Sequence, residues 1–262
     1  MGKGNTALKR ARREKNDEFY TQKKDIENEL IHYYHHLKDK IVYCNCDDYR
    51  KSKFVEYFME NFDKIGLKKL ISTGFSKDGQ GTYSEYDGTV FKTGFLSGNG
   101  DALGEECTEI LKQADVIVTN PPFSLLRKYV PHLMKYEKKF IILGNMNAVT
   151  YKEIFPYIKN NELWLGMNWI KDFVQPNGEV KKFGNICWFT NIPHNKHNEK
   201  LDLHRKYNET DYPKYKNYDA IEVSRVSEIP MDYEVEKIVT EEELNKLKEQ
   251  GFIIEIIEEY CN

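Results

Sequence analysis

The sequence predicts an α/β fold: a mostly parallel sheet with an antiparallel hairpin at one edge and helices on both faces. Apolar, β-branched runs of strand length alternate with stretches of helical periodicity through most of the chain, and this alternation indicates a parallel sheet with crossover helices. The last two runs, 163–169 and 186–190, have no helical stretch between them, which favours an antiparallel edge hairpin. Apolar residues make up 40% of the 262 residues, enough for a real core.

Composition argues against several classes of protein. No apolar run approaches the ~20 residues that span a bilayer, and the charged N-terminus carries no secretory apolar segment. We therefore expect a soluble, cytoplasmic protein. The five cysteines are scattered and odd in number, which favours reduced thiols over a disulfide framework. Cys44 and Cys46 suggest a metal site, but no second close pair of Cys or His completes four ligands, so we expect no metal.

The chain begins with a basic arm, residues 1–16. Within residues 1–15, six lysines and arginines stand against one glutamate, a net charge of +5, which leaves −8 for the rest of a chain whose net charge is −3. A basic arm on a mildly acidic body is the expected footprint of phosphate contact. The alternative is a solubilising tail.

The first elements of the fold are a helix over 24–38 and a strand over 41–44. The helix would bury one apolar face, formed by Ile26, Leu30, Tyr33 and Leu37. After the strand, Ser52 can cap a second helix that ends at Gly66. A second strand follows over 67–73.

Polar residues stand where the first strand ends: Asn45, Cys46, Asp47 and Asp48. Open α/β sheets bind ligands at the carboxyl ends of their strands. These residues therefore predict a ligand-binding loop. The alternative for Asp47 and Asp48 is a turn and cap pair without a ligand.

Residues 74–100 form an insertion rich in Gly, Ser and Tyr, with a hairpin signal at Asp87-Gly88. Either a loop over the active site or an edge ribbon fits this composition. Asp101 follows, and it can cap the helix predicted over 104–113.

The most informative stretch is ADVIVTNPPFSLL, residues 114–126. Residues 116–119 form a buried parallel strand, and two consecutive prolines then force a turn, after which Ser124 can cap a helix. The side-chain carbonyl of Asn120 and the backbone carbonyl of Pro121 are two acceptors for one amino group. Phe123 adds a flat apolar face, so the turn suits a planar amine such as adenine. The alternative is an Asx-Pro turn with a core phenylalanine.

The chain continues with a helix to Tyr136 and a strand over 140–144. Thr150 and Glu153 predict a capping box for a helix over 151–159. Residues 193–233 interleave aromatic and basic residues, which suits either contact with a distorted duplex or an ordinary polar loop region. A helix over 240–249 and a strand over 251–257 would end the chain.

The chain resembles the EcoRI-type adenine-specific DNA methyltransferases, which use S-adenosylmethionine. The resemblance covers most of residues 17–230 and rests on these motifs: DEFYTQ (17–22), DIENEL (25–30), VYCNCDD (42–48), GLKKLI (66–71), NGDAL (99–103), VTNPPFSL (118–125), FIILGNMNAVTYKEIFP (140–156) and FGNICWFTN (183–191). It implies a Rossmann-like S-adenosylmethionine-dependent methyltransferase fold. The expected organisation is the arm 1–16, a catalytic domain over 17–192 that includes the 74–100 insertion, and a C-terminal extension over 193–262 with possible DNA contact.

The resemblance also implies roles for single residues. The catalytic motif is Asn120, Pro121, Pro122 and Phe123. Cofactor-binding residues would be Tyr20, Thr21, Asn45, Cys46, Asp47, Asp48, Asp101 and Ala102. Asp47, or else Asp48, would receive the cationic amino group of S-adenosylmethionine, and Asp101 would lie near the amino group of its adenine. No acid follows the second strand, so the residue that binds the ribose stays unassigned.

The function implied is methyl transfer from S-adenosylmethionine to N6 of a flipped-out adenine at a specific site in double-stranded DNA, as the modification half of a restriction-modification system. We expect a monomer that needs no membrane and no obligate protein partner. Similar pockets also occur in enzymes that methylate RNA bases or protein glutamine amides. A non-catalytic DNA-binding protein on the same scaffold is a further alternative.

Overall fold

The computed structural model describes residues 21–174, 180–197, 203–214, 221–223 and 228–233. The chain forms two compact units, residues 1–198 and 199–262. The helices and strands named below belong to the first unit. The basic arm, Tyr20, and the helix and strand predicted over 240–249 and 251–257 lie outside the described residues.

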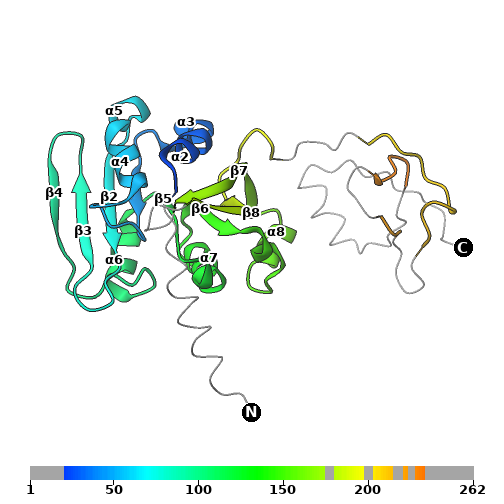
Figure 1. The fold of residues 1–262 in the computed structure, drawn as a ribbon. Helices are drawn as coiled ribbons and strands as arrows, with labels where there is room; N and C mark the ends of the chain where they lie inside the picture. The colour runs from blue at the N-terminus through cyan, green and yellow to red at the C-terminus, as the bar shows by residue number, and fades with distance from the viewer. Residues whose placement is uncertain (1–20, 175–179, 198–202, 215–220, 224–227, 234–262) are drawn as a thin grey trace, which may run out of the picture. The chain divides into compact units, whose positions relative to one another are not determined.

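An eight-stranded sheet forms the centre of the first unit, with the strand order β4-β3-β2-β1-β5-β6-β8-β7 (Figure 1). Its strands are β1 (Ile41–Cys44), β2 (Lys69–Gly74), β3 (Thr82–Tyr86), β4 (Phe91–Phe95), β5 (Val116–Thr119), β6 (Lys139–Asn145), β7 (Trp164–Val174) and β8 (Val180–Thr190). β2, β1, β5 and β6 are parallel. Of the eight, only β3 and β8 run against the others. The mostly parallel sheet with an antiparallel edge hairpin is confirmed.

The insertion over 74–100 is an edge ribbon. β3 pairs antiparallel with β2, and β4 pairs antiparallel with β3. The turn between them contains Gly88 in the left-handed region (φ 94°), a conformation that glycine adopts without strain. The sheet therefore ends in an antiparallel hairpin at both edges. The sequence predicted the hairpin of the last two strands and left the edge ribbon as one of two alternatives.

Helices cover both faces of the sheet (Figure 1). One face carries α2 (Lys23–Leu30), η1 (Ile31–Tyr33), α3 (Tyr34–Leu37), α4 (Lys53–Glu60) and α5 (Phe62–Ile65), and the other carries α6 (Glu105–Gln113), α7 (Leu126–Lys135) and α8 (Phe155–Lys159). Along β1, Val42 and Cys44 pack into the first core and Tyr43 into the second. This alternation follows from the two-residue period of a strand, and burial on both faces explains the uninterrupted apolar runs.

The predicted caps around α4 and α5 are confirmed. The side chain of Ser52 accepts hydrogen bonds from the backbone N–H groups of Phe54 and Val55. Gly66 ends α5 in the left-handed conformation. The helix predicted over 24–38 is divided by the 3-10 turn η1, although all four residues of its predicted apolar face are fully buried.

Two predicted caps are wrong, because 3-10 turns take their place. The backbone N–H of Leu125 bonds to the carbonyl of Pro122, so the chain passes through η2 (Phe123–Leu125) before α7, and Ser124 makes no cap. The hydroxyl of Thr150 donates to the carbonyl of Asn147 within η3 (Met146–Thr150). α8 begins only at Phe155, without a side-chain cap.

Backbone packs directly on backbone where β2 ends. A Cβ on Gly100 would lie 2.5 Å from the carbonyl oxygen of Gly74, and one on Gly81 would lie 2.6 Å from Cα of Gly100. Gly100 also has a positive φ of 79°. These contacts join the end of β2, the start of β3 and the 96–101 turn at the carboxyl edge of the sheet.

We predict that Gly100→Ala lowers the free energy of unfolding by at least 1–2 kcal/mol, which is roughly the cost of a non-glycine residue in the left-handed region. The clash of the added methyl group with the backbone of Gly74 adds to this cost. Gly94→Ala is the matched control, since a Cβ there has nothing within 4 Å. Urea unfolding of both variants checks this. Equal stability of the two variants would contradict the close packing.

Candidate functional site

Hydrogen bonds tie the carboxyl ends of β1 and β5 together. The backbone N–H of Cys46 donates to Oγ1 of Thr119 (3.1 Å), and this hydroxyl donates to Oδ2 of Asp47 (2.5 Å). The two loops lie side by side because β1 and β5 are parallel neighbours. The predicted ligand loop and the predicted catalytic turn therefore meet at one edge of the sheet.

Asp47 is the centre of this junction. Its Oδ1 accepts a hydrogen bond from Oγ of Ser52 (2.7 Å), and its carboxylate also accepts from the backbone N–H of Asn120. The residue is only 7% exposed. Burial raises the pKa of Asp47 to about 6, and the hydrogen bonds from Thr119, Ser52 and Asn120 partly offset that rise. Asp47 thus fixes the backbone at the first residue of the predicted catalytic turn.

The turn itself lies partly open to solvent. Asn120, Pro122 and Phe123 are half-buried and Pro121 is buried. Phe123 packs against the core on both faces of the sheet. The structure therefore holds the backbone and the ring of the motif in place, and leaves surface on both for a ligand.

Two buried polar atoms at predicted cofactor residues have no hydrogen-bond partner among the described residues: Nδ2 of Asn45 and Oγ1 of Thr21. Asn45 is fully buried, and its Oδ1 accepts a hydrogen bond from the hydroxyl of Tyr129. Buried polar groups in native proteins almost always have partners. A polar ligand at the end of β1 would supply an acceptor for Nδ2 of Asn45, which fits a cofactor with carboxylate and hydroxyl groups.

The other predicted cofactor acids are engaged in their own loops. Asp48 forms an ion pair with Arg50 (2.6 Å). Burial raises the pKa of Asp48, but the hydrogen bonds from Arg50 outweigh this and hold it below its usual value. Asp101 is exposed, and its Oδ1 accepts from the backbone N–H of Leu103 (3.0 Å). The N-cap of α6 is Gly104, so Asp101 closes the preceding turn instead of capping that helix. Ala102 is buried in the core.

Three residues at this edge had no role in the sequence prediction. Thr119 links the two loops, and Tyr129 supports the amide of Asn45. Phe75 directly follows β2 and is 62% exposed, an unusual state for a phenylalanine. An aromatic residue right after a buried strand could have indicated Phe75, whereas Tyr129 lies 84 residues from its partner and left no local signal.

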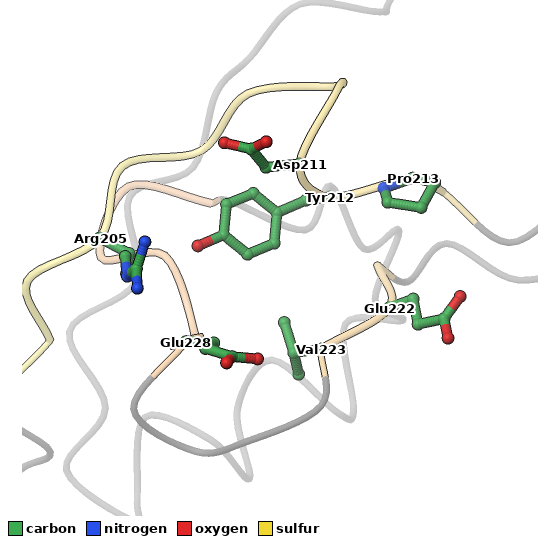
Figure 2. Close-up of a pocket in the computed structure, with 7 residues that line it drawn as sticks. All are labelled: Arg205, Asp211, Tyr212, Pro213, Glu222, Val223 and Glu228. Carbon is green, nitrogen blue, oxygen red and sulfur yellow. The ribbon is translucent and has the colours of Figure 1, made fainter.

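A separate pocket of about 410 Å³ lies within the second unit (Figure 2). Its lining consists of Arg205, Asp211, Tyr212, Pro213, Glu222, Val223 and Glu228. None of the predicted catalytic or cofactor residues belongs to it. Three carboxylates against one guanidinium make an unfavourable lining for phosphate, so the predicted DNA contact of 193–262 gains no support from this pocket.

Within the described part of the chain, no group of three or more His, Cys, Asp or Glu residues is placed to hold a metal ion. Over the same residues, every helix is too short or too polar to cross a bilayer.

Comparison with known proteins agrees with the interpretation of the geometry. The family described as Adenine-specific methyltransferase EcoRI matches residues 7–96 and 86–260. The chain is 44% identical to the Type II methyltransferase M.EcoRI of Escherichia coli over 267 residues, covering 87% of this chain and 82% of the relative. It is 39% identical to M.MgeORF184P of Mycoplasma genitalium and 38% identical to M.MpnI of Mycoplasma pneumoniae, both named Type II methyltransferases, with 86% of this chain and 77% of each relative covered. No solved structure matches significantly.

We predict an inverse pH dependence of stability from Asp47. Its pKa rises from 3.8 in the unfolded chain to about 6 in the fold, so between these values the folded chain retains a proton that the unfolded chain has lost. The stability from this group is fully present below about pH 4 and is lost as the pH rises through 6. The free energy of unfolding of the wild type minus that of Asp47→Asn should fall by roughly 1.4 kcal/mol per pH unit across this window.

Urea unfolding at several pH values measures this difference. Asp78→Asn, at an exposed position, controls for the loss of one carboxylate. A wild-type minus Asp47→Asn difference that does not change between pH 4 and 6.5 would show that Asp47 is not buried in the way described.

Proposed function

Since the chain belongs to the EcoRI-type family of adenine-specific methyltransferases, we propose that it methylates adenine at the turn Asn120–Phe123, with S-adenosylmethionine as donor. The chain is a DNA adenine methyltransferase of the Type II class, the modification half of a restriction-modification system. The observation that carries the assignment of the site is the junction at Asp47, which joins the catalytic turn to the predicted donor loop.

The exocyclic amine of adenine is a weak nucleophile because its lone pair is shared with the ring. In the proposed site, the side-chain carbonyl of Asn120 and the backbone carbonyl of Pro121 accept hydrogen bonds from its two N–H groups. This favours a tetrahedral nitrogen and stabilises the positive charge that develops on it, since the dipoles are fixed in advance. Asp47 contributes by holding the backbone N–H of Asn120. Asp47 and Thr119 thus position Asn120, in addition to the contact with the methyl donor proposed for Asp47 below. Alignment of the reacting atoms supplies the rest of the rate increase.

The target nitrogen is out of reach in a stacked duplex, so the adenine must rotate out of it. Phe123 offers the ring on which the extruded base stacks. Because Phe123 packs against the core on both sides of the sheet, its ring plane is set before the base arrives. Stacking on an aromatic side chain contributes about 1–3 kcal/mol per base, enough to offset part of the cost of unstacking.

S-adenosylmethionine, when bound, supplies a methyl group on a cationic sulfur. On this proposal, Nδ2 of Asn45 donates a hydrogen bond to a polar group of the donor, and Oγ1 of Thr21 donates or accepts one, which would satisfy both atoms. We propose that a carboxylate of the 45–48 loop faces the ammonium group of the donor, with Asp47 as the first choice and Asp48 as the second. The remaining members of the proposed site are Tyr20, Cys46, Asp101 and Ala102. Phe75 presents a flat apolar surface beyond β2 for an adenine ring.

The substrate assignment has alternatives within the same chemistry, namely RNA bases and protein glutamine amides. The family and the basic arm support double-stranded DNA, and we propose that the enzyme acts on it as a monomer in the cytoplasm. To test this, the purified protein is incubated with labelled S-adenosylmethionine and either duplex DNA, RNA or protein. N6-methyladenine in hydrolysed DNA supports the proposal. Label in RNA or protein alone would contradict it, and DNA binding without donor binding would indicate a non-catalytic scaffold.

We predict that Asn120→Ala lowers kcat by at least 10²–10³, the typical loss on removing one electrostatic contact to the reacting group. Affinity for S-adenosylmethionine should stay near the wild-type value, because the Asn120 side chain belongs to the base side of the site. Single-turnover methylation and calorimetric titration of the donor measure the two effects. Asn160→Ala, at an exposed position after α8, is the control. Near wild-type methylation by Asn120→Ala would refute its role.

A further inference from the structure

The hairpin of β7 and β8 extends beyond the sheet that carries it. The last pair between β6 and β8 is Asn145 with Ile186. β7 and β8 continue to pair past that point, through Asp172 with Lys182 and on to Val174 with Val180. We call residues 171–174 and 180–185 the arm; it is a different segment from the basic arm 1–16. The turn 175–179 between its strands lies outside the described residues.

The arm leaves the sheet at the catalytic edge. β7 is antiparallel to β8, and β8 is antiparallel to β6, so β7 runs in the direction of β6 and its parallel neighbour β5. The carboxyl end of β5 carries Asn120, and the carboxyl end of β7 therefore points out of the same edge. The register of β7 against β8 also shifts between Leu165 and Trp169 and again between Ile170 and Asp172. Such bulges bend a strand and are common beside active sites.

Four hydrogen bonds fix the base of the arm, three to Glu29 and one to Asn145. The carboxylate of Glu29 is fully buried and accepts hydrogen bonds from the backbone N–H groups of Met167 and Asn168, both at 2.8 Å. Nδ2 of Asn168 adds a third (3.0 Å). On the other strand, Nδ2 of Asn185 donates to Oδ1 of Asn145 (3.2 Å) at the end of β6. A buried carboxylate requires such partners, so these contacts indicate a fixed root for the arm.

Size and charge of the arm suit a nucleic acid groove. A two-stranded ribbon fits the major groove of B-DNA, which is about 8.5 Å deep. The four residues of β7 in the arm span roughly 13 Å at about 3.3 Å per residue, so the ribbon is long enough to reach the groove floor. Its sequence contains three lysines, at positions 171, 181 and 182, and one acid, Asp172. This net positive charge contrasts with the net negative body of the chain.

We propose that the arm is a DNA-contacting element that enters the groove beside the target adenine, and that Glu29 is the residue that positions it. The inference rests on the proposed function, since it names the surface by which this enzyme holds its duplex. The DIENEL motif thereby gains a role: Glu29 joins α2 to β7 across 138 residues of chain.

The first test reverses charge on the arm with Lys181→Glu plus Lys182→Glu. The matched control is Lys40→Glu plus Lys68→Glu, because these exposed lysines precede β1 and β2 at the opposite edge of the sheet. We expect the arm variant to lose at least tenfold in affinity for duplex DNA. Each lost phosphate contact should also reduce the slope of log K against log salt by about 0.9. The control should keep the wild-type slope, and donor affinity should be unchanged in both.

A second variant removes the outer part of the arm and leaves its base and the rest of the sheet in place. Residues 173–181 are replaced by Asn-Gly, which closes a two-residue turn between Asp172 and Lys182. With thermal stability and donor binding retained, DNA affinity and kcat/KM for DNA should fall at least tenfold. Wild-type DNA affinity in this variant and in the charge-reversed one would overturn the inference while leaving the proposed function intact. A wild-type enzyme that binds its donor but methylates no DNA would instead refute the proposed function itself.

Discussion

The site depends on one buried hydrogen bond, from the hydroxyl of Thr119 to the carboxylate of Asp47. A carboxylate taken out of water is costly unless its oxygens are satisfied, and here Thr119, Ser52 and the backbone of Asn120 all serve that purpose. The acid needs these donors, and Thr119 and Asn120, at the end of β5, are thereby held against the loop that follows β1. A turn that contains two prolines has few backbone N–H groups of its own for fixing its position. The neighbouring loop supplies the missing constraint, so in the proposed site Asp47 sets the position of Asn120.

The surrounding fold supports this edge from three directions. Backbone contacts at Gly100 bring the 96–101 turn against the end of β2, and Phe123 is held between the two cores. Glu29 fixes the bulged part of β7. In each case the contact joins segments that lie far apart in the chain. The carboxyl edge is thus built from loops that have little regular structure of their own and that gain order from buried contacts with one another.

The sequence predicted the central parallel strands well because they bury both faces, as in Val116–Thr119, whose four residues are all buried. The edge strand β4 is mostly exposed and has no such run. The sequence also located the polar strand ends, and the conformation of Gly66 followed from helix-end chemistry. The errors at Ser124 and Thr150 share a cause. A hydroxyl before a helix can bond forward as a cap or stay within a 3-10 turn, and the local sequence does not choose between the two. Contacts such as Thr119 with Asp47 span 72 residues and depend on the strand order, which no local pattern contains.

The two halves of the proposed site differ in whether their polar groups already have partners within the protein. This difference bears on what each ligand adds when it binds. On the base side, the backbone of Asn120 and the ring of Phe123 already have their protein contacts. On the donor side, Asn45 and Thr21 each keep a buried polar atom without a partner among the described residues. A buried donor or acceptor without a partner costs about 1–3 kcal/mol. A ligand that satisfies these atoms recovers that energy, so donor binding should stabilise the fold as well as load the site. The base side gains nothing comparable from a ligand, because its preorganisation is already present in the protein. In the proposed site, the methyl donor would therefore complete the donor side, and an extruded adenine would enter a turn whose backbone Asp47 already holds.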